Sequence, residues 1–363
     1  MTIKTSAALV AALLLAACAS APVAPPAAGP TPPGPAAPPS ASLVLPGERH
    51  LANVRQLSFG GENAEAYWSF DGKLLIFQST RDGAPCDQQY VMDGSGSNVR
   101  RVSSGAGRTT CGYFFPDGSR ILFSSTHEAG AACPAPPDMS QGYVWALSDY
   151  QIYTARPDGS DLRVLAPAPG TYTAEATISK DGWIVFTSTR DGDLDMYKMR
   201  LDGSGLTRLT SEPGYDGGAF FSADGKRIVY RASRPVPGKE MDDYRALLSR
   251  KLVRPGKLEI MVMDADGSNV RQVTRLGAGS FAPFFFPDGK RIIFSSNAGD
   301  PKGRNFDLFL VNDDGTGLER VTTYDGFDGF PMFSPDGRKL VFASNRNGAK
   351  RGETNLFVAD WVE

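Results

Sequence analysis

The sequence predicts an all-β fold, a six-bladed β-propeller built from four-stranded antiparallel blades. Three features support this prediction: a unit repeated six times around an Asp-Gly pair, a second Asp-Gly pair inside five of the units, and an N-terminal segment that matches a strand of the fourth unit. Four-stranded units that recur at this period are typical of propellers.

Each unit begins with aromatic residues, continues with Asp-Gly and ends in an alternating apolar run, as in YFFPDGSRILFSST. This pattern predicts a strand, a tight turn and a second strand. Glycine suits the turn because it adopts positive φ without strain. The six turn aspartates are Asp71, Asp117, Asp181, Asp224, Asp288 and Asp336.

A second Asp-Gly turn predicts two further strands in each of five units, at Asp93, Asp158, Asp202, Asp266 and Asp314. We name the four strands of a blade a to d, in chain order. The sixth unit stops after strand c, whereas residues 53–56 read NVRQ, as do residues 269–272 in strand d of the fourth blade. We therefore predict that the N-terminal strand completes the last blade and closes the ring, which leaves no blade edge unpaired.

The N-terminus has the organisation of an export signal. Lys4 precedes the apolar residues 7–15, and the run ends in Leu-Ala-Ala-Cys at Cys18. This resembles the lipobox of bacterial lipoproteins and implies lipidation of Cys18, while Ala19 implies the outer membrane, facing the periplasm. A plain secretory signal is the alternative. The expected domains are a signal peptide (1–18), a Pro/Ala-rich tether (19–47) and the propeller (48–363).

The repeat pattern F-x-P-D-G-K/R-x-I-x-F-x-S, followed by Y-x-x-x-x-D-G-S, resembles the PD40 (WD40-like) repeat of TolB-like propellers over residues 51–362. TolB proteins carry an α/β domain ahead of the propeller, and here the tether takes that place. The resemblance implies a lipoprotein that binds a protein or peptide partner in the cell envelope.

Two blades carry insertions of about twenty residues between strands b and c, at 127–150 in the second blade and 232–257 in the fourth. Loops b–c and d–a share one face of a propeller, so both insertions decorate that face, our candidate binding face. In the second insertion, Met241, Tyr244, Leu248 and Leu252 have helical spacing, which favours a short helix docked on its own propeller.

Charged residues recur where strands begin or end on the same face. They are expected to line the channel mouth and hold a charged ligand or peptide, or else to pair with neighbouring blades. Trp145 either contacts a partner or packs its loop onto the blade. The candidate residues are Glu65, Arg81, His127, Tyr143, Trp145, Glu175, Arg190, Asp216, Arg234, Asp328 and Arg346.

The remaining cysteines also fall on this face. We expect a disulfide between Cys86 and Cys111, because both are anchored to adjacent framework strands and an oxidising periplasm favours pairing. Cys133 would stay free, with a zinc or redox role as an alternative. The segment D-G-D-L-D supplies a weak calcium candidate at Asp191, Asp193 and Asp195, although it lacks the length and terminal Glu of an EF-hand loop.

Composition limits the other functions. The net charge of −2 lacks the basic footprint of a nucleic-acid binder, and two histidines leave little material for metal clusters or catalytic triads. Hydrolase and P-loop motifs are absent from the sequence. We predict a non-enzymatic, monomeric envelope protein that needs no cofactor, with glycan binding or cleavage by the channel-mouth acids and arginines as the alternative.

Overall fold

The computed structural model describes residues 42–140 and 142–363. The predicted signal peptide, Cys18 and residues 19–41 of the tether therefore lie outside the described residues. Within the described chain there is no helix of the length and apolarity that a membrane crossing requires.

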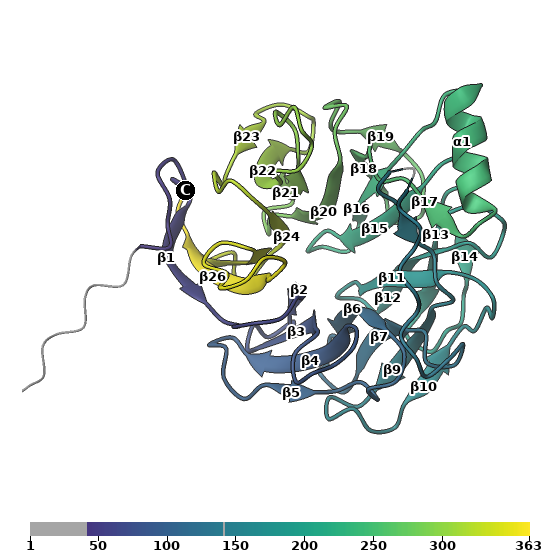
Figure 1. Ribbon diagram of the computed structural model, residues 1–363, viewed down its shortest axis with the longest axis horizontal. Helices are drawn as coiled ribbons and strands as arrows, with labels where there is room; N and C mark the ends of the chain where they lie inside the picture. The colour runs from purple at the N-terminus through teal and green to yellow at the C-terminus, as the bar shows by residue number, and fades with distance from the viewer. Residues whose placement is uncertain (1–41, 141) are drawn as a thin grey trace, which may run out of the picture. The chain divides into compact units, whose positions relative to one another are not determined.

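Six four-stranded antiparallel sheets form the ring predicted from the repeats (Figure 1). The strands of the first three blades are β2 (Asn63–Trp68), β3 (Leu74–Ser79), β4 (Gln88–Asp93) and β5 (Arg100–Arg101); β6 (Thr109–Phe114), β7 (Ile121–Ser125), β9 (Gln151–Ala155) and β10 (Arg163–Leu165); and β11 (Thr173–Ile178), β12 (Trp183–Ser188), β13 (Asp195–Arg200) and β14 (Thr207–Arg208).

The other three blades have the same order, with the first strand innermost. Their strands are β15 (Asp216–Phe221), β16 (Arg227–Ala232), β18 (Glu259–Asp264) and β19 (Arg271–Gln272); β20 (Ser280–Phe285), β21 (Arg291–Ser296), β22 (Asp307–Asn312) and β23 (Glu319–Arg320); and β24 (Asp328–Phe333), β25 (Lys339–Ser344), β26 (Asn355–Trp361) and β1 (Leu51–Gln56).

The closing strand confirms the prediction made from the NVRQ match. Strand β1 pairs antiparallel with β26, from Leu51 opposite Trp361 to Gln56 opposite Phe357. In Figure 1 the purple N-terminal strand lies beside the yellow C-terminal strand. The first and last described segments of the propeller thus share one sheet, which joins the two ends of the ring.

Local sequence explains the first turn of each blade. In the first blade the Ser69 hydroxyl donates to the Asp71 carboxylate at 2.7 Å, and the Gly72 N–H donates to the Ser69 carbonyl at 2.9 Å. Gly72 has a φ of 70°, a conformation that favours glycine. The Asp-Gly pair therefore fixes the reversal between strands a and b.

A buried aromatic residue repeats at the centre of every strand b and fills the space between neighbouring blades. The six members are at most 1% exposed: Phe77, Phe123, Phe186, Tyr230, Phe294 and Phe342. Burying each aromatic ring contributes roughly 1.5–3 kcal/mol, so this position anchors the packing of every blade.

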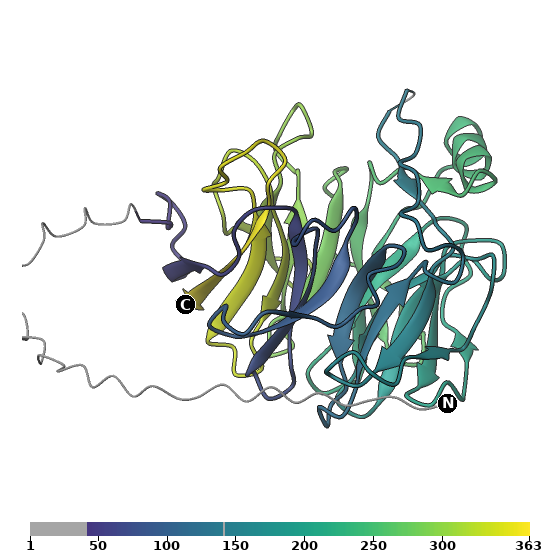
Figure 2. The same cartoon turned by 60° about the horizontal axis from the view of Figure 1, so that its bottom comes forward.

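The two insertions add the remaining elements. They form β8 (Trp145–Ala146), the helix α1 (Lys239–Leu248) and β17 (Leu252–Val253). The predicted helix is confirmed, with Tyr244 and Leu247 as its buried residues. Leu252 does not extend the helical stripe, because the chain has by then entered β17. Figure 2 shows α1 and the loop of the first insertion projecting from the same side of the ring.

Candidate functional site

A ring of backbone bulges surrounds the channel centre. Every strand a shifts register after its second residue, and the residue at the shift has a φ between 49° and 61°. A bulge re-aims its side chain, and here all six line one cavity of about 40 Å³. The six bulge residues are Glu65, Cys111, Glu175, Gly218, Ala282 and Phe330.

Polar side chains occupy this ring in the first three blades only. Glu175 is the most extensively bonded of them. Its Oε1 accepts from the hydroxyls of Tyr172 at 3.0 Å and Tyr215 at 2.6 Å, and from the Arg231 guanidinium at 2.5 Å. Its Oε2 accepts from Thr187 at 2.8 Å and from a backbone N–H at 2.7 Å. With both oxygens fully used, Glu175 holds the third and fourth blades together.

Glu65 differs from Glu175 because its carboxylate has one hydrogen bond, from the Cys111 N–H at 3.1 Å. Burial raises the pKa of Glu65 to about 7, and the nearby Glu175 carboxylate acts in the same direction. Burial also raises the pKa of the Cys111 thiol well above its usual value. Glu65 is thus a channel group that titrates near neutral pH.

The acids predicted at the channel mouth occupy two different positions. Glu65 and Glu175 are bulge residues, whereas Asp216 and Asp328 are the first residues of their strands. The latter two are paired with predicted arginines: Asp216 accepts from Arg234 at 2.7 Å, and Asp328 from Arg346 at 2.9 Å. Burial raises the pKa of Asp216 to about 7. Each of these two pairs lies within a single blade, so they are structural pairs but not the contacts with neighbouring blades considered above.

The other candidate residues of strand b lie over their own blades. The Arg81 guanidinium is 5.4 Å from the Phe77 ring centre, and that of Arg190 is 5.1 Å from the Phe186 ring centre. Such cation–π contacts contribute roughly 0.5–2 kcal/mol each. The His127 ring lies 4.4 Å from a tyrosine ring of the same blade, and burial lowers its pKa. None of these three residues lines the channel cavity.

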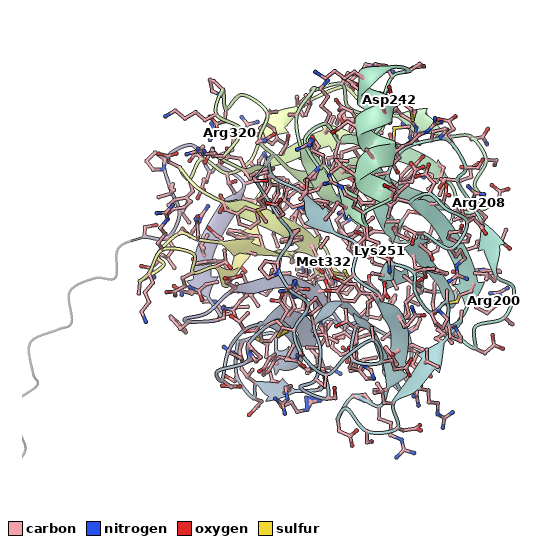
Figure 3. The ribbon with its side chains drawn as sticks, turned by 45° about the vertical axis from the view of Figure 1, so that its right-hand side comes forward. Arg200, Arg208, Asp242, Lys251, Arg320 and Met332 are labelled. Atoms are coloured by element: carbon pink, nitrogen blue, oxygen red, sulfur yellow. A yellow bond between two sulfur atoms is a disulfide. The ribbon has the colours of Figure 1, made fainter. Side chains whose placement is uncertain are left out.

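The two insertions join across the candidate face into a single unit, which we call the platform (residues 127–150 and 232–257). Strand β8 pairs antiparallel with β17, with Ala146 opposite Leu252. Lys251, labelled in Figure 3 near α1, pairs with Asp149 of the first insertion. The Tyr244 hydroxyl of α1 donates to Asp193 of the third blade. Segments about 100 residues apart thus support one another.

Trp145 and Tyr143 have different environments within the platform. The Trp145 ring lies 6.2 Å from that of Tyr215 and 6.5 Å from that of Phe281, with the Arg231 guanidinium 5.2 Å from its centre. Trp145 therefore packs the platform onto the propeller. Its indole N–H donates to the Tyr143 hydroxyl at 3.2 Å, while 61% of Tyr143 remains exposed.

The predicted cysteine pairing was wrong. Cys86 forms a disulfide with Cys133, with their Cα atoms 5.9 Å apart, and Cys111 is free. Cys111 cannot reach the loop because it is the bulge residue of its strand and lines the channel. The backbone hydrogen bond from Gly107 to Ala131, 2.8 Å long, brings the first insertion back to the first blade, next to Cys86.

The three carboxylates of the calcium candidate each accept a hydrogen bond from another side chain of the protein. Asp191 accepts from a tyrosine hydroxyl at 2.7 Å, Asp193 from Tyr244, and Asp195 from Arg208 at 2.6 Å. Among the described residues, no group of three or more His, Cys, Asp or Glu side chains is arranged to hold a metal ion.

A second cavity lies at the opposite end of the channel, where the a–b turns meet, and it was not predicted. Its volume is about 630 Å³, and the ends of strand a from all six blades line it. The sequence signal was the residue before each turn aspartate, which is apolar in five of the six copies. This apolar pattern indicates a cavity only once the fold brings the six residues together around one opening.

Known proteins resemble this chain in sequence and in fold. No protein-family model matches it. An uncharacterised protein of Agrobacterium fabrum is 28% identical over 209 residues, which cover 51% of this chain and 64% of that protein. The TolB homolog of Chlorobium luteolum is 27% identical over 186 residues, covering 44% of this chain and 42% of its own length.

Among solved structures, the putative TolB of Agrobacterium tumefaciens superposes with a TM-score of 0.57 at 22% identity, covering 84% of this chain and 91% of that chain. The matched regions are less than two thirds of the curated relatives' own lengths. The repeats and the strand order show that the chain is a six-bladed β-propeller, and in fold it is similar to the putative TolB of Agrobacterium tumefaciens.

Proposed function

We propose that this protein is an envelope lipoprotein whose propeller binds a protein or peptide partner through the platform. The observation that carries the proposal is the pairing of β8 with β17, which joins two insertions into one raised surface. Two insertions that only lengthened separate loops would not be expected to pair through their strands. The likeness to TolB-like proteins supports an envelope role.

The exposed residues of the platform suit protein recognition. Met139, Tyr143 and Val236 are 47%, 61% and 58% exposed, although large apolar side chains usually avoid water. Charged side chains lie next to this part of the first insertion: Asp243 and Arg254, which pair at 3.3 Å, line a small pocket together with Asp138 and Gly142. Exposed tyrosine within a polar rim is typical of binding hot spots. Replacing one hot-spot side chain by alanine typically costs about 2 kcal/mol or more of binding free energy.

The test is capture of partners from membrane extracts by the wild type and by Tyr143→Ser. Leu206→Ser is the matched control, because Leu206 is 45% exposed and follows a c–d turn on the other side of the ring. We expect one protein to be captured by the wild type and the control and to be lost with Tyr143→Ser. Equal capture by all three would exclude the platform as the binding surface.

The proposed anchor is Cys18, which lies outside the described residues. We expect Cys18→Ser to move the protein from the outer-membrane fraction to the soluble periplasm, with its thermal stability unchanged. An unchanged membrane fraction would rule out lipid anchoring. Size-exclusion chromatography of the Cys18→Ser protein should give a monomer.

We do not propose glycan cleavage. A glycosidase acid or base needs a carboxyl group that is free to exchange a proton with substrate. Glu175 has both oxygens engaged in hydrogen bonds, and its partner Arg231 is 8% exposed. Glu65 lines a cavity of about 40 Å³, which is too small for a sugar ring.

A further inference from the structure

The larger cavity has the dimensions of a ligand site. Its volume of about 630 Å³ falls within the roughly 300–1,000 Å³ typical of small-molecule pockets. It lies at the a–b turn end of the channel, whereas the platform is built from b–c insertions at the other end. The cavity is therefore separate from the surface proposed to bind a protein partner.

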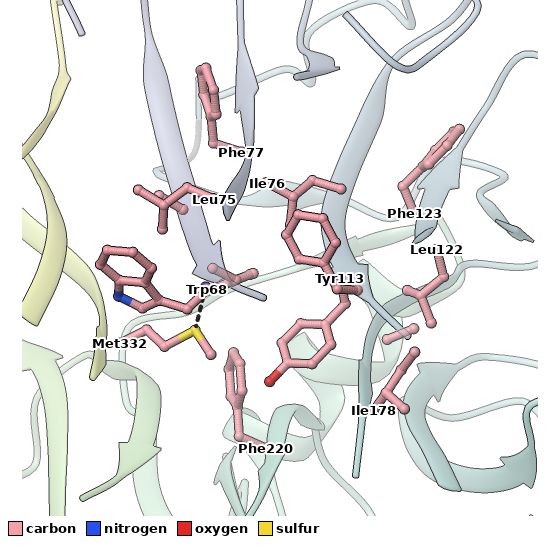
Figure 4. Close-up of a cluster of buried hydrophobic side chains, with 14 of the residues drawn as sticks. Trp68, Leu75, Ile76, Phe77, Tyr113, Leu122, Phe123, Ile178, Phe220 and Met332 are labelled. Atoms are coloured by element: carbon pink, nitrogen blue, oxygen red, sulfur yellow. Dashed lines mark hydrogen bonds between the residues drawn. The ribbon is translucent and has the colours of Figure 1, made fainter. Parts of the chain in front are cut away.

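An aromatic layer separates this cavity from the polar bulge ring. The Phe220 ring lies 5.3 Å from that of Tyr67 and 5.3 Å from that of Phe284, and 6.3 Å from that of Tyr113. Figure 4 shows Phe220, Tyr113 and Met332 converging from different blades. The layer gives the cavity an apolar floor, away from Glu65.

The rim is built from the residue before each turn aspartate. Proline occupies three of these positions, and proline fixes its own φ, so the mouth is rigid without a ligand. Lys180 is the single charged residue among the six. The rim residues are Phe70, Pro116, Lys180, Ala223, Pro287 and Pro335.

The serine hydroxyls of the wall are already engaged within the turns, whereas the Trp68 indole N–H has no hydrogen-bond partner among the described residues. Four wall serines donate their hydroxyls to the turn aspartate two residues later, at 2.6–2.7 Å: Ser69, Ser179, Ser222 and Ser334. At the rim, Asp71 is paired with Lys73 at 3.0 Å. The Tyr113 hydroxyl, by contrast, has no hydrogen-bond partner among the residues that the structure describes.

Walls of this kind hold water poorly. A buried water needs two to four polar partners, about three on average, and beyond the Tyr113 hydroxyl and the Trp68 indole N–H these walls offer few unpaired polar groups. Replacing poorly held water with apolar groups gains affinity. A charged ligand would instead lose its hydration without a counter-charge in the interior of the cavity.

We propose that this cavity binds an uncharged small molecule with an alkyl or aromatic body and one hydrogen-bonding group, which pairs with the Tyr113 hydroxyl. Rim rigidity, an apolar floor and saturated wall serines together favour this ligand class. The site is additional to the proposed partner-binding surface, so either proposal can fail without the other.

The test uses the full chain with Cys18→Ser, which requires no detergent. The probe is the fluorescent, uncharged N-phenyl-1-naphthylamine, displaced by 1-hexanol, 1-octanol and 1-decanol. We expect saturable binding of one probe per chain, with alcohol affinity rising about fourfold per methylene until the cavity is full. Decanoate and decylammonium should bind about tenfold more weakly than decanol.

Two variants locate the site. Ala223→Trp fills the mouth from an exposed turn position and should weaken probe binding more than about tenfold. The matched control is Ala349→Trp, at an exposed b–c loop position of the sixth blade, which should bind as the wild type does. Circular dichroism melting should show that both variants remain folded.

The hydroxyl is tested by Tyr113→Phe, which should weaken octanol binding about threefold to tenfold and leave 1-chlorooctane unaffected. Three results would overturn the proposal: no saturable probe binding, equal loss in Ala223→Trp and Ala349→Trp, or tighter binding of decanoate than of decanol. Each can be read without knowing the partner protein.

Discussion

Replacing Arg346 with Ala should weaken the closure of the ring. Its guanidinium donates to Glu48, which precedes the closing strand β1, at 2.8 Å, and to Asp328 of the last blade at 2.9 Å. The Arg346 side chain is 4% exposed and both carboxylates are 0% exposed. Removing one partner of a buried ion pair typically costs about 3–5 kcal/mol, because it leaves uncompensated charge. We expect a loss of that size in the free energy of unfolding.

The assay is urea-induced unfolding at about pH 7.5, with Arg338→Ala as the matched control. The Arg338 side chain is 85% exposed, so its removal should change the free energy of unfolding by less than about 0.5 kcal/mol. Arg346→Lys should fall between the two, since lysine keeps the charge but lacks the planar fork.

Acid should partly rescue Arg346→Ala. Burial raises the pKa of Asp328, while Arg346 opposes that rise. Without the guanidinium the pKa rises further, so the carboxyl becomes neutral at a higher pH and the deficit shrinks as the pH falls from neutrality. Equal stability of Arg346→Ala and Arg338→Ala would refute this account of ring closure.

Three further predictions concern the channel and the platform. The pKa of Glu65 is raised from 4.5 to about 7, so the folded state holds this proton more tightly than the unfolded state. The free energy of unfolding should therefore fall as the pH rises from about 5 to about 8. Glu65 accounts for up to about 3 kcal/mol of this fall, and Glu65→Gln should remove that share in urea titrations, while Asp216, whose pKa is also raised to about 7, keeps its own share. Cys133→Ser should cost about 2–4 kcal/mol and make the protein insensitive to reductant, whereas a loss of reductant sensitivity in Cys111→Ser would contradict the observed pairing. Tyr244→Phe should lower the melting temperature by the equivalent of about 1 kcal/mol and increase hydrogen exchange in α1; unchanged exchange would show that the bond to Asp193 does not anchor the helix.

The repeat made the scaffold predictable because each turn has its own chemical signature. In all six blades the glycine N–H of the a–b turn donates to the carbonyl three residues earlier, as Gly72 does to Ser69, so local sequence sufficed to predict the strands. The match of residues 53–56 to residues 269–272 extended this reasoning to ring closure, since equivalent strands carry equivalent residues.

The candidate functional surfaces depend on contacts between parts of the chain that the repeat pattern does not relate to one another. The pairing of Ala146 with Leu252 joins insertions from different blades, and neither segment alone predicts the other. Glu65 and Asp216 both lie near the start of a strand a, but Glu65 is the third residue, which the bulge aims into the channel, whereas Asp216 is the first residue and pairs with Arg234. The cavity of about 630 Å³ escaped prediction because six turn residues build it together.

The central claim, that the platform is the partner-binding surface, is tested most directly by photocrosslinking in the native envelope. A benzophenone amino acid would replace Tyr143, which is 61% exposed on the platform, or Leu206, which is 45% exposed near a c–d turn. We predict one specific crosslinked protein from position 143, identifiable by mass spectrometry, and none from position 206. The same product from position 206 alone, or no product from position 143, would contradict the claim.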